Sequence, residues 1–381
     1  MDKRSPGFDR RTFLRSLAVA GAAGMTCSPA LGSPSELQPQ ADQERFVKKA
    51  RYVTTLKERK VRCDLCPRSC EVADRERGYC GVRENRGGTY YTLVWGRLCA
   101  LNVDPIEKKP FFHFLPGTTA LSVATAGCNM ECLFCQNWEI SQFRPEQVPA
   151  YFVSPERLAE LAASRRIPSI AYTYNEPVIF YEYMYDSAVA GNQRGVRSVM
   201  VSNGYIHQKP MEALCEVLAA VKIDLKAFTE SFYKKYTKGE LKPVLETLKL
   251  LARRKKWFEV VVLLIPTLND GRKELEELCK WLAGELGPEV PVHFTRYHPT
   301  YKLQNLPPTP LRSLERAHEI GRKAGLAFVY IGNVPGHSAE STYCPSCGKP
   351  LIQRYGYRIL SNNIKDGKCA FCGRVIPGVW S

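Results

Sequence analysis

Apolar runs alternate with amphipathic stretches over most of the chain. Seven runs rich in valine, isoleucine and alanine predict buried strands, at residues 120–125, 169–172, 198–202, 221–225, 258–265, 290–295 and 326–331. Helical patterns lie between them. Repeated strand–helix units favour right-handed crossovers and a parallel sheet, and this number of units favours a partial or full barrel. The pattern therefore predicts an α/β fold.

The predicted helices carry recognisable start signals and apolar faces. Ser154 and Thr309 are each followed by proline, which pairs an N-cap side chain with a residue suited to the first helical position. Cys215 and Cys279 each fall on a helical face where apolar residues recur at i, i+3, i+4 and i+7. We interpret both cysteines as small core residues rather than ligands.

Polar residues follow several of the predicted strands. They are Cys128 after the first strand, Glu176 after the second, Asn203 after the third, Lys226 after the fourth and His298 after the sixth. In barrels of this kind the chemistry takes place at the carboxyl ends of the strands. We therefore expect these side chains to share one site.

Composition indicates an ordinary globular protein with an excess of positive charge. The 381 residues carry a formal net charge of +16, and the positive charges are scattered apart from a run at residues 253–256. We interpret that run as a solvated helix face, and no recognition motif supports nucleic-acid binding. After the N-terminus, no uncharged apolar run is long enough to span a bilayer.

Eleven of the 15 cysteines fall into three groups. The groups are Cys63, Cys66, Cys70 and Cys80; Cys128, Cys132 and Cys135; and Cys344, Cys347, Cys369 and Cys372. Closely spaced cysteines chelate metals more readily than they connect distant loops, so we favour thiolate ligation over disulfides.

The central group is the most informative. Three thiolates on one short loop can hold three irons of a cubane cluster and leave the fourth iron open to another ligand. The alternative is a zinc knuckle or a ferredoxin loop that lacks a nearby fourth ligand. That alternative is disfavoured because the next cysteine, Cys215, lies on a buried helical face and because the loop follows the first predicted strand.

The CxxxCx-aromatic-C pattern at residues 128–135, with Phe134 before the last cysteine, resembles the signature of the radical S-adenosylmethionine (SAM) superfamily. Together with residues 102–110, His113-Phe114 and Gln136-Asn137-Trp138, it resembles the radical SAM enzymes of the AmmeMemoRadiSam system, relatives of pyruvate formate-lyase activating enzymes. The resemblance covers roughly residues 60–375. It implies a radical SAM partial (β/α)6-type barrel.

The resemblance also implies an activity. SAM would bind the open iron of a 4Fe-4S cluster and be cleaved reductively to a 5′-deoxyadenosyl radical, which abstracts hydrogen from a partner protein or a small substrate. Implied partners are Memo-like and AMME-type proteins or a glycyl-radical-type protein, with flavodoxin or ferredoxin as electron donor. The enzyme would be an oxidoreductase in which the cofactors carry the chemistry, so we assign no catalytic side chain.

Further cofactor-binding residues follow from the same resemblance. Glu176, in a turn where Tyr174-Asn175 stands in place of glycines, would accept the SAM amino group. Lys226 would pair with the SAM carboxylate, and Asp224 would contribute to a cation site. Phe134, Asn203 and His298 complete the expected set.

The two flanking groups are expected to bind metal separately. Four thiolates at Cys344, Cys347, Cys369 and Cys372 suit a structural zinc or a rubredoxin-like iron. Zinc or an auxiliary iron–sulfur cluster would suit the group from Cys63 to Cys80, with a slight preference for zinc or a structural role.

The predicted organisation has five parts. They are a twin-arginine-like signal segment at 1–32, a linker at 33–60, an N-terminal four-cysteine module with its lead-in at 61–117, the barrel at 118–335 and a C-terminal four-cysteine, zinc-ribbon-like module at 336–381. The signal segment is compatible with export to the periplasm or with a vestigial leader on a cytoplasmic protein.

Two other functions remain open from the sequence. One is a non-catalytic iron–sulfur or zinc protein that transfers electrons or binds a partner, and it predicts that SAM is neither bound nor cleaved. The other is a radical SAM enzyme that modifies RNA, suggested by the net charge.

Overall fold

The structure is a computed structural model that describes residues 43–381. The predicted signal segment at 1–32 and Cys27 lie outside the described residues. No helix within 43–381 combines the length and the apolar character needed to cross a membrane.

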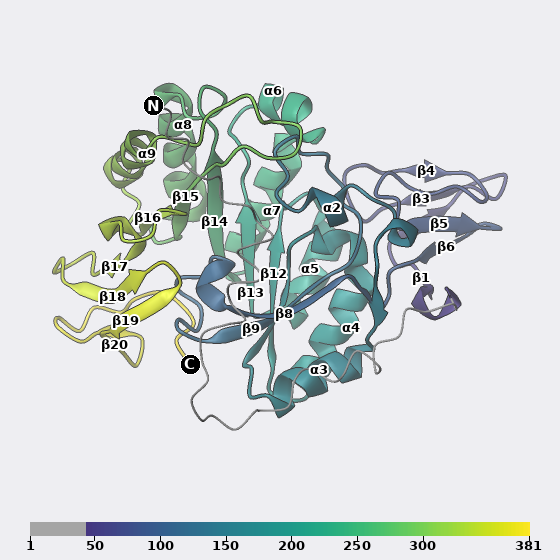
Figure 1. Ribbon diagram of the computed structural model, residues 1–381, viewed down its shortest axis with the longest axis horizontal. Helices are drawn as coiled ribbons and strands as arrows, with labels where there is room; N and C mark the ends of the chain where they lie inside the picture. The colour runs from purple at the N-terminus through teal and green to yellow at the C-terminus, as the bar shows by residue number, and fades with distance from the viewer. Residues whose placement is uncertain (1–42) are drawn as a thin grey trace, which may run out of the picture. The chain divides into compact units, whose positions relative to one another are not determined.

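Eight strands form the central sheet, in the order β16-β15-β14-β13-β12-β11-β9-β8 (Figure 1). The parallel strands are β9 (Thr119–Ala124), β11 (Ser169–Tyr172), β12 (Arg197–Ser202), β13 (Ala220–Asp224), β14 (Trp257–Leu264), β15 (Val292–Arg296) and β16 (Val329–Gly332). The sheet is open between its edge strands β16 and β8. All seven strands expected from the sequence are present, so the predicted α/β fold with a parallel sheet is confirmed.

Strand β8 (Ala100–Pro105) was not expected from the sequence. It pairs antiparallel to β9 along its whole length. Asn102 and Val103 at its centre are exposed, so this edge strand lacks the apolar run by which the others were recognised.

Helices connect the parallel strands. They are α3 (Pro155–Ser164), α4 (Tyr181–Asn192), α5 (Gln208–Val217), α7 (Leu241–Arg253), α8 (Arg272–Trp281) and α9 (Leu311–Lys323). The N-cap at Ser154 is confirmed, because its hydroxyl accepts a hydrogen bond from the Arg157 N–H at 3.2 Å. Helix α7 ends at Arg253, and residues 254–255 follow it. All three residues are exposed, as expected for a solvated face.

The predicted N-cap at Thr309 is wrong. Helix α9 begins at Leu311, with Pro310 at the N-cap position. The fully buried Thr309 hydroxyl instead donates to Leu264 O at 2.6 Å and accepts from Tyr297 N–H at 2.9 Å. It therefore joins two segments of the barrel rather than starting a helix.

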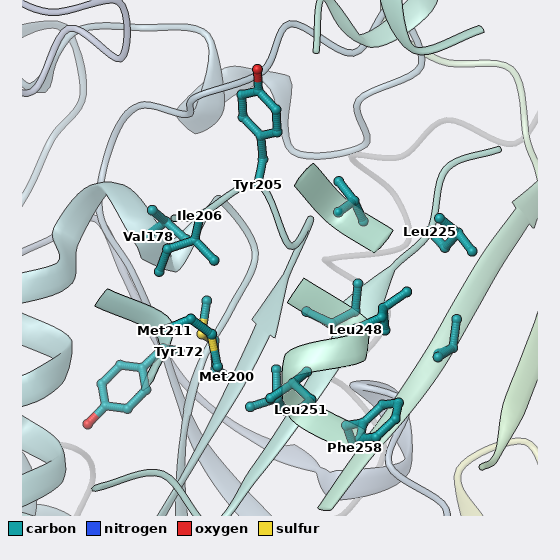
Figure 2. Packing of buried hydrophobic residues seen from close by; sticks show 14 of the residues in the cluster. Tyr172, Val178, Met200, Tyr205, Ile206, Met211, Leu225, Leu248, Leu251 and Phe258 are labelled. Carbon is teal, nitrogen blue, oxygen red and sulfur yellow. The ribbon is translucent and has the colours of Figure 1, made fainter. Parts of the chain in front are cut away.

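The main cluster of buried apolar residues lies between the sheet and the helices packed against it, α5 and α7 among them. Figure 2 shows Met211 of α5 near Met200 of β12, and Leu248 and Leu251 of α7 packed towards Phe258 of β14. Cys215 and Cys279 are 5% and 0% exposed, which confirms them as core residues.

A small N-terminal module precedes the barrel. Its strands are β1 (Lys48–Lys49), β2 (Val53–Thr55), β3 (Val61–Cys63), β4 (Glu71–Val72), β5 (Arg83–Arg86) and β6 (Thr89–Thr92), which form two antiparallel sheets (Figure 1). Residues 48–55, expected to belong to a linker, thus form part of this module. A fully buried ion pair between Arg83 and Glu182 attaches it to α4.

The C-terminal residues form a second small module next to β16 (Figure 1). Its strands are β17 (Thr342–Tyr343), β18 (Pro350–Tyr355), β19 (Arg358–Asn362), β20 (Ile364–Lys365) and β21 (Lys368–Cys369). Buried residues of this module pack with Phe112, Phe328 and Tyr330 in a cluster of their own.

Candidate functional site

A cavity of about 760 Å³ opens at the carboxyl ends of the parallel strands. The predicted site residues that line it are Cys128, Cys132, Phe134, Cys135, Glu176, Asn203, Asp224 and Lys226. His298 is exposed and does not contribute to the described lining. A different histidine of β15, His293, lines the cavity.

The loop with the three central cysteines starts at a constrained glycine. Gly127 has φ +95°, and a Cβ at this position would lie 2.6 Å from Val82 Cγ1 and 2.8 Å from Cys80 O. Only glycine adopts this conformation readily and leaves space for both neighbours. The glycine at position 127 thus fixes the direction in which the chain enters the cysteine loop.

Two asparagines hold the loop against the end of β12. Asn129 Nδ2 donates to Tyr205 O at 2.8 Å, and Asn203 Nδ2 donates to Asn129 Oδ1 at 2.9 Å. Asn203 was expected at the site, whereas the role of Asn129 was missed. The only signal in the sequence was its place inside the cysteine pattern.

The three thiols are suited to bind a soft metal centre that contains several irons. Burial raises the pKa of each thiol, to about 12 for Cys132, so all three are protonated at neutral pH without a metal. Metal binding must therefore displace their protons. Three cysteine sulfurs at one end of one cavity are a donor set that fits an iron–sulfur cluster with one open position.

Glu176 lies beside the cysteines and is almost fully buried. Its Oε2 accepts from Asn203 N–H at 2.7 Å, and its Oε1 accepts from Ser202 Oγ at 2.7 Å and Val178 N–H at 3.0 Å. Burial raises the pKa of Glu176 to about 7, although these hydrogen bonds act in the opposite direction. The carboxylate is therefore fixed in position and close to its ionisation midpoint at neutral pH.

The turn before Glu176 keeps a glycine-like backbone without glycine. Tyr174 has φ +69°, in the left-handed region. Its hydroxyl donates to Asp104, and its carbonyl accepts from Asn137 Nδ2 at 2.6 Å. These contacts hold the unfavourable conformation. Next to it, the buried Asn175 Oδ1 has no hydrogen-bond partner among the described residues and is available to a ligand.

Asp224 lies between two lysines at the end of β13. Lys226 Nζ donates to Asp224 Oδ2 at 2.8 Å, and Lys222 donates to Oδ1. Burial alone would raise the pKa of Asp224, but the two lysines lower it to about 2. Burial lowers the pKa of Lys222, whereas Asp224 raises the pKa of Lys226 despite its burial, so Lys226 provides a positive charge that suits an anionic group. Lys222 was missed, although a lysine within an apolar strand was a usable signal.

A buried pair of a carboxylate and an imidazole lies on β14 and β15, and its histidine lines the cavity. His293 Nε2 donates to Glu259 Oε2 at 2.7 Å, and both side chains are fully buried. Burial lowers the pKa of His293. Burial would raise the pKa of Glu259, but the hydrogen bond from His293 holds it below its usual value. Both residues lie in apolar strands and were missed for that reason.

The C-terminal module completes the wall of the cavity. Tyr355, Gly356 and Tyr357, at the turn between β18 and β19, line it together with the buried Glu340. The two tyrosines are 61% and 51% exposed, so they contact the solvent at the mouth of the cavity.

A chain of hydrogen bonds joins this module to the barrel through His113. Burial lowers the pKa of His113 to about 4, so its ring is neutral: Nδ1–H donates to Pro377 O at 2.7 Å and Nε2 accepts from Tyr330 at 2.6 Å. Thr342 then donates to Tyr330 at 2.9 Å, and Arg354 donates to Thr342 at 2.8 Å. His113 therefore has a structural role.

The C-terminal cysteines form a compact cluster that could bind a metal ion. The sulfur atoms of Cys344, Cys347, Cys369 and Cys372 all lie within 4.8 Å of one another. The Cys344–Cys372 and Cys347–Cys369 sulfurs are 3.6 and 3.8 Å apart. A regular tetrahedron with metal–sulfur bonds of about 2.3 Å has edges of about 3.8 Å. These four thiols could therefore hold a single tetrahedral metal ion.

An open parallel barrel sheet, with three cysteine thiols in a cavity at its carboxyl end, defines a radical SAM fold. The profile described as "Radical SAM superfamily" matches residues 122–282. The chain is 45% identical over 332 residues to the uncharacterized protein MJ0808 of Methanocaldococcus jannaschii, covering 87% of this chain and 99% of that protein. The chain belongs to the radical SAM superfamily, which implies a 4Fe-4S cluster and SAM.

Two solved structures are also similar. A domain of pyruvate-formate lyase-activating enzyme from Bacteroides vulgatus has a TM-score of 0.39 and 15% identity, and the match covers 43% of this chain and 98% of that one. A radical SAM methyltransferase from Sphaerobacter thermophilus has a TM-score of 0.45 and 18% identity, over 62% and 71% of the two chains.

Proposed function

We propose that this protein is a radical SAM enzyme of oxidoreductase type, which cleaves SAM reductively and abstracts hydrogen from a partner protein or a small substrate. One observation carries the proposal: the thiols of Cys128, Cys132 and Cys135 share a single cavity with a fixed carboxylate and a lysine–aspartate cluster. When bound, the cluster and SAM supply the 5′-deoxyadenosyl radical.

The side chains of the cavity bind and orient the cofactors. Cys128, Cys132 and Cys135 hold the cluster. Glu176 accepts the SAM amino group, because its carboxylate is already fixed by three donors. Lys226, charged because Asp224 raises its pKa, attracts the SAM carboxylate. The cavity walls at the strand ends would limit the access of water to the bound cofactors and would position the substrate beside them.

The substrate is proposed to be a protein segment, as for activating enzymes. In the AmmeMemoRadiSam interpretation the partners are Memo-like or AMME-type proteins. The exposed Tyr355 and Tyr357 at the cavity mouth support a protein substrate, because tyrosine is enriched where proteins contact each other. A structural zinc on the C-terminal cysteines completes the proposal.

Anaerobic reconstitution tests the proposal. The protein is supplied with iron and sulfide, reduced with dithionite and mixed with SAM, and 5′-deoxyadenosine is measured by chromatography. We expect product from the wild type and none from Cys132→Ala. Cys99→Ala is the matched control, because Cys99 lies outside the described lining of the cavity. No product from the wild type, or equal product from Cys132→Ala, contradicts the proposal.

A further inference from the structure

Four cysteines of the N-terminal module lie next to the barrel but outside its cavity. Cys63 ends β3 and is buried, whereas Cys66, Cys70 and Cys80 are partly exposed. Cys63 N–H donates to Cys70 O at 2.9 Å, which brings both ends of the Cys63–Cys70 loop together. None of the four contributes to the described lining of the cavity, so a metal held here does not contact the SAM site directly.

The spacing of these thiols does not match a single ion. Within residues 43–381, only the C-terminal cysteines bring three or more possible ligand atoms within 4.8 Å of one another. A tetrahedral zinc site needs sulfur–sulfur distances of about 3.8 Å. The three sulfurs of Cys128, Cys132 and Cys135, like those of the N-terminal set, do not all lie within 4.8 Å of one another. Wider spacing suits a polynuclear cluster, since each sulfur then binds a different iron.

Donors also point at these sulfur atoms. The buried Arg83 Nη1 donates to Cys63 Sγ at 3.6 Å, and Tyr79 N–H donates to Cys70 Sγ at 3.4 Å. Met130 N–H donates to Cys128 Sγ at the same distance of 3.4 Å in the central loop. Hydrogen bonds to cysteine sulfur stabilise the charge of an iron–sulfur cluster and set its potential.

The N-terminal module lies in contact with the loop that carries Cys128. Cys80 O is only 2.8 Å from where a Cβ of Gly127 would be, and Gly127 directly precedes Cys128. Arg68, between Cys66 and Cys70, donates from Nε to Asn129 O at 3.0 Å. The two cysteine sets therefore lie on loops that touch each other.

From these contacts we propose that Cys63, Cys66, Cys70 and Cys80 hold a second, polynuclear iron–sulfur cluster that delivers electrons to the cluster of the cavity. One electron from a protein of the flavodoxin or ferredoxin class reduces the N-terminal cluster. That electron then reduces the cavity cluster, and the N-terminal cluster is reoxidised without any bond or proton change. The electron delivery rests on the proposed function, but the metal assignment does not.

Metal counting tests the assignment on the full chain. A variant with Cys128, Cys132 and Cys135 all replaced by alanine removes the cavity ligands. After anaerobic reconstitution, we expect it to keep about four irons, about four sulfides and one zinc per chain. Adding Cys66→Ser and Cys70→Ser should remove the iron and leave the zinc, whereas adding Cys347→Ser should remove the zinc and leave the iron. Two zincs and no iron in the triple variant would overturn the assignment.

Electron delivery is tested by freeze-quench electron paramagnetic resonance after mixing with reduced flavodoxin. In the triple alanine variant, the signal of the reduced N-terminal cluster should persist. In the wild type, this signal should decay while the cavity cluster is reduced. In the double variant Cys66→Ser/Cys70→Ser, flavodoxin should no longer reduce the cavity cluster. Reduction of the cavity cluster at the wild-type rate in this variant overturns the delivery. Absence of 5′-deoxyadenosine from the wild type would contradict the proposed function and the electron delivery that rests on it. It would leave the metal assignment standing, because the metal counts are independent of SAM cleavage.

Discussion

Gly127 lies directly before the first cavity cysteine, and its conformation is constrained in two ways. Its φ of +95° disfavours any side chain, and the space for a Cβ is already filled by Val82 and by the backbone of Cys80. The carbonyl of Cys80 belongs to the backbone, so it cannot move aside as a flexible side chain can.

Gly127→Ala is expected to abolish cluster binding in the cavity. The added methyl group displaces the start of the loop and with it Cys128. Iron per chain should fall by the same amount as in Cys128→Ala, measured by metal analysis after reconstitution. Gly195→Ala is the matched control, because Gly195 has a similar φ of +69° with nothing within 4 Å of its Cβ position. Equal iron in Gly127→Ala and the wild type would contradict this account.

Glu176 should make SAM binding depend on pH. Because burial raises its pKa to about 7, the carboxylate is neutral below that pH and ionised above it. An ammonium ligand prefers the ionised form, so Kd should fall as the pH rises from about 6 to 8. Calorimetry on the reconstituted protein measures this dependence.

The variant Glu176→Gln should weaken SAM binding and lose the pH dependence. A hydrogen bond to a charged group contributes about 1.5–3 kcal/mol, which corresponds to roughly ten- to a hundredfold in Kd. A pH dependence that persists in this variant would show that another group is responsible.

At the scale of elements, the sequence predicted every parallel strand because each carries a continuous apolar run. The cysteines of the site were found because their spacing is local. Lys222, Glu259 and His293 were missed because each lies within an apolar strand. Glu259 and His293 pair across the neighbouring strands β14 and β15, and Lys222 pairs with Asp224 two residues further along β13. The edge strand β8 was missed because its exposed centre has no apolar signal.

At Thr309, hydrogen bonds to other segments of the barrel override the local helix-start pattern of threonine followed by proline. Thr309→Val keeps the shape but leaves Tyr297 N–H and Leu264 O without this partner inside the barrel. We expect a loss of about 2–3 kcal/mol in the free energy of unfolding. Ser154→Ala removes a surface N-cap and should cost about 1 kcal/mol. Chemical denaturation of both variants measures the difference, and the reverse order would contradict the assignment of Thr309.

At the scale of the whole molecule, the C-terminal module and the barrel share one wall of the cavity. Arg354 connects the module to the barrel both through Thr342 and by donating from Nη2 to Phe112 O at 2.8 Å. Glu259 accepts hydrogen bonds from the N–H groups of Phe112 and His113. The position of the wall therefore depends on the fold of the module.

Removal of the C-terminal metal should loosen this wall. In Cys372→Ser we expect faster amide hydrogen exchange in residues 336–381 and also in β16 and residues 111–115, measured by mass spectrometry. Iron bound by the central cysteines should remain. Exchange that increases only within 336–381 would show that the module is independent of the barrel.

The turn with Tyr355 and Tyr357 joins two strands of the small C-terminal sheet and lines the cavity. It belongs to the same module as the four thiols that could hold a metal ion. Loss of a metal ion held by those thiols would therefore disturb this part of the cavity and leave the loop with Cys128, Cys132 and Cys135 in place. Metal binding in the C-terminal module and access to the cavity would then be coupled through one hairpin.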